Sequence, residues 1–311
     1  MIRHWNAEGT RVLERRAHEV GAGAVAVSDD GKPVVSAQLM RTALEYARTF
    51  GIPVADHCED PTLAAGGAMN EGLMSAKLGL RGIPAEAEEI MAIRDILLAR
   101  LTGGHIHLCH MSTAGSVELI RWGKERGINV TAEVCPHHLS LTEDAVAGYD
   151  TNAKMNPPLR TERDVEALQA AVKDGTIDVI ATDHAPHHYD EKEREFADAP
   201  NGIVGLETAL AVNLTWLVRR SVVSLDTLIE RMSCAPARLF KLPGGTLRRG
   251  TTADVTVFDP DASWVVDPAA FRSKGRNSPY AGQTLHGRVS LTLVDGRVIH
   301  RADGSGGGVS S

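Results

Sequence analysis

The sequence predicts an α/β fold, part of a TIM-type (β/α)8 barrel, and three observations support this prediction. Short apolar segments alternate with amphipathic helical segments, as βα repeats do. Each apolar segment ends in polar residues suited to a divalent metal ion or its substrate. In a parallel barrel the carboxyl ends of the strands form one shared site, so these residues should converge. The strand-like segments are 24–30, 53–57, 105–110, 130–137 and 178–184. Their polar ends predict that the chain is part of a metallohydrolase barrel.

The segments between these strands carry apolar residues at spacings of three and four, as helices packed on a sheet require. The alternation indicates a parallel sheet with right-handed crossovers, and about five βα units of an incomplete barrel. An open doubly wound sheet binds ligands at its switch point, so polar residues at five strand ends favour the barrel. The expected helices span 37–50, 86–101, 114–126, 162–172 and 206–217.

The composition changes after a helical stretch at 224–240. Glycine and proline then separate short alternating strands at 244–247, 253–260 and 289–299, which indicates a small β portion. We therefore expect a partial barrel over 1–243 and a small C-terminal β domain of the sandwich type over 244–303. The glycine-rich residues 304–311 cannot bury apolar surface and are expected to be a disordered tail.

Composition narrows the functional classes. The chain has 311 residues, 43% of them hydrophobic, and 40 acidic against 33 basic residues, which give a net charge of −7. No basic stripe is present, so we expect no nucleic-acid partner. No apolar run approaches the roughly 18 residues of a membrane span, and we expect no membrane partner. The four cysteines form no C-x-x-C pair, which suggests reduced thiols in a soluble, cytoplasmic protein.

Two histidines and two aspartates at strand ends are the candidate metal ligands: Asp30, His57, His110 and Asp183. Carboxylate oxygens combined with two imidazoles suit zinc or a similar divalent ion. A single polar residue at a strand end is usually a turn cap or a hydrogen-bonded core residue, but such residues on successive strands favour a site.

Strand parity chooses among the histidines of segment 105–110. In an extended strand, His110 shares one face with Leu108, whereas His105 and His107 share the other. We therefore expect His110 to be the ligand, and His105 and His107 to lie on the helix-facing side.

Six motifs resemble the successive motifs of bacterial type I dihydroorotase, in the amidohydrolase superfamily, and the resemblance runs from about Gly21 to His300. The motifs lie at 28–31 (SDDG), 56–60 (DHCED), 110–113 (HMST), 135–139 (CPHHL), 154–160 (KMNPPLR) and 181–187 (ATDHAPH). The resemblance implies that Asp30 bridges two zinc ions, that His57 and His110 hold one of them, and that Asp183 binds the other. It also implies that Asp183 is the general acid and base.

The same resemblance implies that Asn156, His187 and the loop at Asn201 and Gly202 contact the small-molecule substrate, dihydroorotate. The implied reaction is the reversible hydrolysis of this cyclic amide to N-carbamoyl-aspartate in pyrimidine biosynthesis. Two alternatives stay open, because Asn156 could be a turn residue before two prolines and His187 could order its loop. The charged run 190–195 is expected to be a solvated face, although its position after the last strand also suits a lid.

One motif of the family is missing. Dihydroorotases place a His-x-His-x-Arg segment on the first barrel strand, and nothing before Asp30 matches it. The resemblance therefore implies that the N-terminal third and the first three strands are lacking. We expect one zinc ion to be retained, little or no activity of this chain alone, and homo-oligomer formation through open sheet edges.

Two alternative functions remain. Another cyclic amidohydrolase, such as a dihydropyrimidinase or allantoinase, generally bridges its metals with a carboxylated lysine, where this chain has Asp30. A non-catalytic scaffold for aspartate transcarbamoylase would show lost metal ligands, although the ligands of the remaining strands are all kept.

Overall fold

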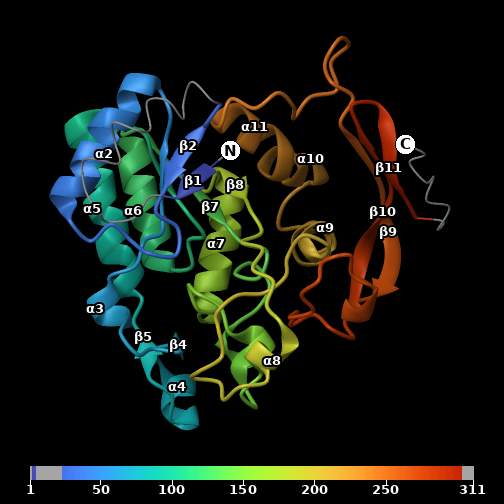
Figure 1. Ribbon diagram of the computed structural model, residues 1–311, viewed down its shortest axis with the longest axis horizontal. Coiled ribbons are helices and arrows are strands. Elements are labelled where there is room, and N and C mark those ends of the chain that lie inside the picture. The colour runs from blue at the N-terminus through green and yellow to red at the C-terminus, as the bar shows by residue number, and fades with distance from the viewer. Residues whose placement is uncertain (1, 5–22, 303–311) are drawn as a thin grey trace.

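The computed structural model describes residues 2–4 and 23–302, and its centre is a parallel sheet (Figure 1). Each strand pairs in parallel with its neighbours. The sequence prediction of a parallel α/β core is confirmed. The strand order is β1 (Ile2–His4), β2 (Ala26–Ser28), β3 (Val54–Asp56), β6 (Ile106–Leu108), β7 (Val130–Val134) and β8 (Val179–Ile180).

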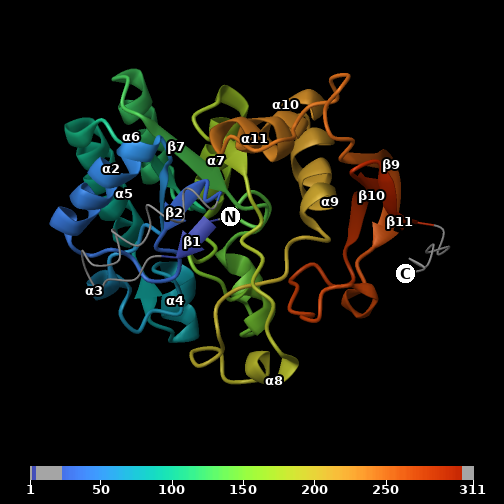
Figure 2. The same ribbon diagram turned by 45° about the horizontal axis from the view of Figure 1, so that its top comes forward.

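Four helices cover one face of this sheet and pack side by side (Figures 1 and 2). Each begins at the residue that the sequence predicts. The first is capped by Ser36, whose side chain accepts from the Leu39 amide, and it ends at Gly51 in the left-handed conformation. The helices are α2 (Ala37–Phe50), α5 (Glu86–Thr102), α6 (Ala114–Glu125) and α7 (Glu162–Asp174).

The later helical segments are less regular than predicted. The segment expected at 206–217 is α9 (Ala209–Asn213) followed by the π-helical turn η3 (Leu214–Val218). The stretch at 224–240 consists of α10 (Leu225–Ile229), the π-helical turn η4 (Glu230–Cys234) and α11 (Ala235–Leu239). Pro236 lies at the start of α11 and has no amide hydrogen, so a regular hydrogen-bond ladder cannot pass through it.

A three-stranded antiparallel sheet follows, in the order β11 (Arg297–Arg301), β10 (Thr284–Val294) and β9 (Val255–Val265). The strand predicted at 289–299 is in fact a hairpin, because Asp295 and Gly296 both adopt positive φ and reverse the chain. The strand predicted at 244–247 is wrong, since that segment contains no strand. Figure 1 shows α9 to α11 between the two sheets. The predicted tail at 304–311 lies outside the described residues.

The short elements between β3 and α5 and the helix directly after β8 lie together at the bottom of Figure 1. After β3 come α3 (Pro61–Ala64), β4 (Met69–Asn70), α4 (Leu73–Leu78) and β5 (Gly82–Ile83). After β7 come the 3-10 turns η1 (Glu143–Val146) and η2 (Thr151–Ala153), and after β8 comes α8 (Tyr189–Lys192). A further 3-10 turn, η5 (Pro268–Ala270), joins β9 to β10.

Strand β1 was not predicted, because three residues are too few to show an alternating pattern. Its presence makes the sheet six-stranded, with one strand more than the five strand-like segments that the sequence predicts. Among the described residues, no helix combines the length and apolar character needed to cross a membrane.

Candidate metal centre

Three of the four predicted ligands converge at the carboxyl ends of neighbouring strands. The Nδ1 atom of His57 lies 3.0 Å from Nε2 of His110. An Asp30 carboxylate oxygen lies 4.0 Å from the first of these nitrogens and 3.8 Å from the second. Both imidazoles are buried, whereas the Asp30 side chain is 46% exposed, so the group can be reached from one side.

The two consecutive aspartates after β2 have different positions. The Asp29 carboxylate is buried and accepts hydrogen bonds from the amides of His57 (2.9 Å) and Val34 (2.7 Å), which joins the ends of β2 and β3. Asp30 instead donates its amide hydrogen to Ser28 Oγ, and its carboxylate lies beside the histidines. Asp29 therefore holds the backbone around the site in place, whereas the Asp30 carboxylate is itself a candidate metal ligand.

The two imidazoles have opposite protonation preferences. Burial and the neighbouring His110 lower the pKa of His57 to about 3, so its ring is neutral. Burial also acts to lower the pKa of His110, but its interaction with the Asp30 carboxylate and the charges of Asp183 and Glu133 outweigh burial and raise the pKa to about 9. A positive charge is thus favoured beside Asp30. Two imidazole nitrogens and a carboxylate oxygen around this position form a donor set that fits a divalent cation.

Asp183 lines the same cavity of about 430 Å³ as Asp30, His110 and Glu133. Burial raises the pKa of Asp183; the negative charges of Asp30 and Glu133 add to this effect and His110 opposes it. Asp183 also has a φ of +45°, a conformation uncommon for a residue other than glycine. A carboxyl group in this environment can hold a proton at a pH where an exposed aspartate would not.

The predicted orientation of His107 is wrong. Its Nε2 lies 3.1 Å from a Glu133 carboxylate oxygen, and both residues line the cavity that contains Asp183. Strand β6 ends at Leu108, whose side chain belongs to the main hydrophobic core. His110 lies beyond the strand with a φ of +40°, so strict alternation does not extend to it. Parity from His110 therefore assigned the faces of β6 incorrectly.

Asn156 contacts a residue that sequence reasoning did not identify. Its side-chain amide donates to a Glu59 carboxylate oxygen at 2.6 Å, and the same oxygen lies 3.9 Å from Nε2 of His57. The side-chain oxygen of Asn156 is buried and has no hydrogen-bond partner among the described residues. Glu59 thus lies between the candidate metal ligand and the candidate substrate residue. Its position two residues after His57 is the sequence signal that could have indicated it.

The other three candidate substrate residues form a second group. The His187 ring lies 2.8 Å from the backbone oxygen of Asn201. Asn277, which was not predicted, accepts from the His187 amide and donates to the backbone oxygens of Gly202 and Ala185. No hydrogen bond in the described part of the chain joins this group to Asn156, although the Gly202 amide donates to the backbone oxygen of Lys154, two residues before Asn156.

One residue of the charged run 190–195 is not solvated. Lys192 is 6% exposed, and its amine donates to the backbone oxygens of Thr151, Lys154 and Pro200. The prediction of a solvated face is therefore wrong for Lys192, which binds the loop after β7 to the loop that precedes Asn201.

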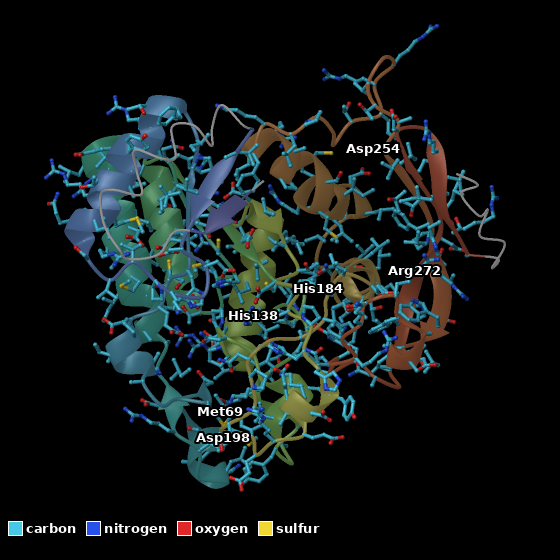
Figure 3. All side chains as sticks on the ribbon, in the orientation of Figure 1. Met69, His138, His184, Asp198, Asp254 and Arg272 are labelled. Carbon is cyan, nitrogen blue, oxygen red and sulfur yellow. The ribbon has the colours of Figure 1, made fainter. Side chains whose placement is uncertain are left out.

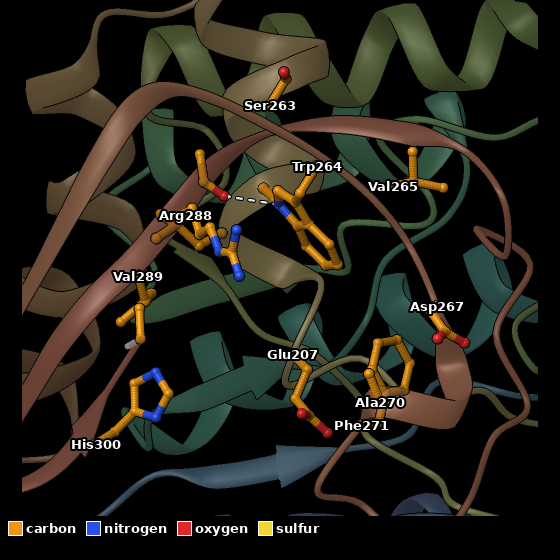
Figure 4. Close-up of a pocket in the computed structure, with 14 residues that line it drawn as sticks. Glu207, Ser263, Trp264, Val265, Asp267, Ala270, Phe271, Arg288, Val289 and His300 are labelled. Atoms are coloured by element: carbon orange, nitrogen blue, oxygen red, sulfur yellow. Dashed lines mark hydrogen bonds between the residues drawn. The ribbon is translucent and has the colours of Figure 1, made fainter. Parts of the chain in front are cut away.

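A larger cavity, of about 590 Å³, lies beside α9 and the sheet of β9 to β11 (Figure 4). Glu207, Phe271, Arg288 and His300 line it, and Trp264 donates its indole N–H to the Gly287 oxygen, shown by a dashed line. None of the predicted site residues lines this cavity, so it is separate from the candidate metal centre.

The sequence profile of the amidohydrolase family matches residues 6–299. The chain belongs to the amidohydrolase family. Among curated members, it is 55% identical over 280 residues to the dihydroorotase of Pelobacter propionicus (strain DSM 2379 / NBRC 103807 / OttBd1). The aligned region covers 90% of this chain and 66% of that relative. It is 50% identical over 298 residues to the dihydroorotase of Syntrophus aciditrophicus (strain SB), and this aligned region covers 96% of this chain and 70% of that relative. The resemblance to dihydroorotase is thereby confirmed.

Solved amidohydrolase structures share the fold. The dihydropyrimidinase from Brevibacillus agri NCHU1002 superimposes with a TM-score of 0.84 at 25% identity, over 96% of this chain and 68% of that chain. The L-hydantoinase from Arthrobacter aurescens gives a TM-score of 0.84 at 29% identity, over 93% of this chain and 67% of that chain. The chain spans about two thirds of the length of the relatives it matches, 66% for the Pelobacter dihydroorotase.

Proposed function

We propose that this chain carries the metal-binding and proton-transfer residues of a dihydroorotase, which converts dihydroorotate and N-carbamoyl-aspartate into one another. The main support is the meeting of Asp30, His57 and His110 at neighbouring strand ends, with Asp183 in the cavity beside them. The 50% to 55% identity to proteins named dihydroorotase favours this reaction over that of the dihydropyrimidinase and hydantoinase structures, which are 25% to 29% identical.

We also propose a place for the chain in a larger fold. The six-stranded sheet would be an arc of an eight-stranded TIM-type barrel, and β9 to β11 would belong to a small C-terminal β domain of the sandwich type. Within the described residues, β1 and β8 each have one strand neighbour. Further barrel strands, a second copy of the chain or aspartate transcarbamoylase would cover these edges. The absence of disulfides among the four cysteines suits the cytoplasm.

Zinc is the proposed cofactor. Asp30, His57 and His110 would hold one ion, while Asp30 and Asp183 would offer oxygen ligands to a second. When bound, such an ion lowers the pKa of water to about 7 and polarises a carbonyl oxygen. His57 contributes as a neutral imidazole, the form that binds metals, because burial disfavours its protonation.

Asp183 is the proposed general acid and base. Its carboxylate would accept a proton from the attacking water and then donate it to the departing ring nitrogen, so that the proton balance of hydrolysis closes on one residue. The raised pKa supports both steps, since a carboxyl group whose pKa lies nearer to neutrality donates and accepts more evenly. Glu133 is a poorer candidate because it already contacts His107.

Asn156 and the group around His187 are the proposed substrate contacts. The unpaired side-chain oxygen of Asn156 could accept a ring N–H, while Glu59 fixes the orientation of its amide. Gly202 brings the backbone close to His187, because a Cβ atom there would lie 3.4 Å from the His187 ring. These contacts would position the ring of dihydroorotate.

Metal analysis and an activity assay test the proposal separately. The purified chain should contain zinc, and His57→Ala combined with His110→Ala should lower the zinc content by one ion per chain. His188→Ala, which changes an exposed histidine, is the matched control. A zinc content that the double variant does not change would refute the metal assignment.

The activity assay follows ring opening by this chain alone and by the chain fused to a segment that supplies His-x-His-x-Arg. We expect little turnover in the first case and zinc-dependent turnover in the second. Strong turnover by the chain alone would show that the added ligands are dispensable. Inactivity of the fused protein would favour the non-catalytic scaffold.

A further inference from the structure

A second cluster of potential metal ligands follows β7. The Sγ atom of Cys135 and one ring nitrogen each of His137 and His138 lie within 4.8 Å of one another. All three residues are buried, with exposures of 0%, 2% and 2%. Figure 3 shows His138 near the centre of the molecule, where its ring is enclosed by protein. The cluster shares no residue with the group of Asp30, His57 and His110.

Two nitrogens of this cluster have no hydrogen-bond partner among the described residues, namely Nε2 of His137 and Nδ1 of His138. The other nitrogen of His138, Nε2, lies 2.9 Å from the backbone oxygen of Pro157. Since a carbonyl oxygen can only accept, this nitrogen carries the hydrogen and Nδ1 has a free lone pair. Metal-binding histidines commonly show this arrangement, with one nitrogen donating to a carbonyl and the other facing the ion.

We propose that Cys135, His137 and His138 form a further metal site, which takes zinc. One thiolate and two imidazoles are a ligand set that zinc prefers. The ligand atoms around a tetrahedral zinc ion lie about 3.4 to 3.6 Å apart, as Zn–S and Zn–N bonds of about 2.3 and 2.1 Å require. The three atoms lie within 4.8 Å of one another, so side-chain movements that bring them closer by up to about 1.4 Å would close the site around one ion.

Metal binding at this site requires the loss of one proton and no other reactant. The Cys135 thiol loses its proton to solvent as its sulfur coordinates the ion, and the two neutral imidazoles each give a lone pair that is otherwise unused. The ion would tie the end of β7 to the chain at Pro157 through His138, next to Asn156. Its role is structural, because the three ligands are buried, and it does not depend on the proposed reaction.

Cobalt substitution provides the decisive test, because a thiolate bound to Co²⁺ gives a charge-transfer absorption that histidine and aspartate ligands do not. Chain produced in cobalt-supplemented medium should show this band. Cys135→Ser should abolish it and remove one metal ion per chain. Cys109→Ser should leave it unchanged, which excludes the cluster of His107, Cys109 and Glu133 as its source.

A second variant keeps the test decisive if Cys135→Ser fails to fold. His138→Gln preserves a donor for the Pro157 oxygen but loses the Nδ1 ligand, so it should weaken the band and lower the metal content. The combined His57→Ala and His110→Ala variant should retain the band, which separates this site from the catalytic proposal. Absence of the band in the unmodified chain, or its persistence in both Cys135→Ser and His138→Gln, would overturn the site.

Discussion

Asp183→Asn is the substitution that most directly tests the proposed chemistry. Asparagine has the size of aspartate, so the buried position stays filled, but it cannot take up and return a proton. The change also removes one negative charge beside Asp30 and Glu133, whose charges raise the pKa of Asp183. We therefore expect the variant to fold normally.

The surroundings of Asp183 set the expected magnitude. Glu133 already contacts His107 at 3.1 Å, and Asp30 lies beside the two candidate histidine ligands, so neither carboxylate is free to replace Asp183. A general acid and base contributes about 10²- to 10⁴-fold to a rate. Turnover in the fused, active protein should fall by this factor, which corresponds to about 2.7 to 5.4 kcal/mol in the barrier.

The assay is steady-state ring opening of dihydroorotate, with zinc content and thermal unfolding measured on the same preparations. Asp174→Asn, an exposed aspartate on α7 paired with Arg121, is the matched control and should leave turnover unchanged. Near-normal turnover by Asp183→Asn, with the metal still bound, would refute the proposed proton transfer.

Three further outcomes are expected. Glu59→Gln should lower zinc affinity by about 10- to 100-fold, measured by calorimetric titration, because the carboxylate beside His57 is lost; unchanged affinity would contradict this role. Gly202→Ala should destabilise the fold by about 1 to 3 kcal/mol, since the residue has a φ of +113° and a Cβ atom would lie 2.5 Å from that of Ala185; denaturant unfolding measures this, and an unchanged midpoint would argue against the strain. Burial lowers the pKa of Lys192 from 10.5 to about 8, so between these pH values the unfolded chain binds more protons than the folded chain. The unfolding temperature of the unmodified chain, relative to that of Lys192→Met, should therefore rise from pH 8 to 10.5. A difference between the two unfolding temperatures that does not change with pH would contradict this.

The parallel α/β core and three residues of the candidate site could be predicted from the sequence alone. Helix starts follow from local signals, such as Ser36 before α2, that do not depend on distant residues. Asp30, His57 and His110 could be placed together because they follow the ends of successive strands that pair in parallel, and such ends meet at one edge of a sheet. That inference needs only the order of the strands.

The contacts made by side chains beyond the strand ends follow from long-range packing and could not be predicted from the sequence. The pairing of Glu59 with Asn156 joins residues 97 positions apart, and no local pattern encodes it. Lys192 has the sequence context of a solvated charge, yet folding surrounds its amine with three backbone oxygens. His107 faces the cavity, and counting back from His110 gave the wrong face because β6 ends at Leu108, where long-range pairing stops. Contacts of this kind depend on how distant loops pack, which periodicity along the chain does not specify.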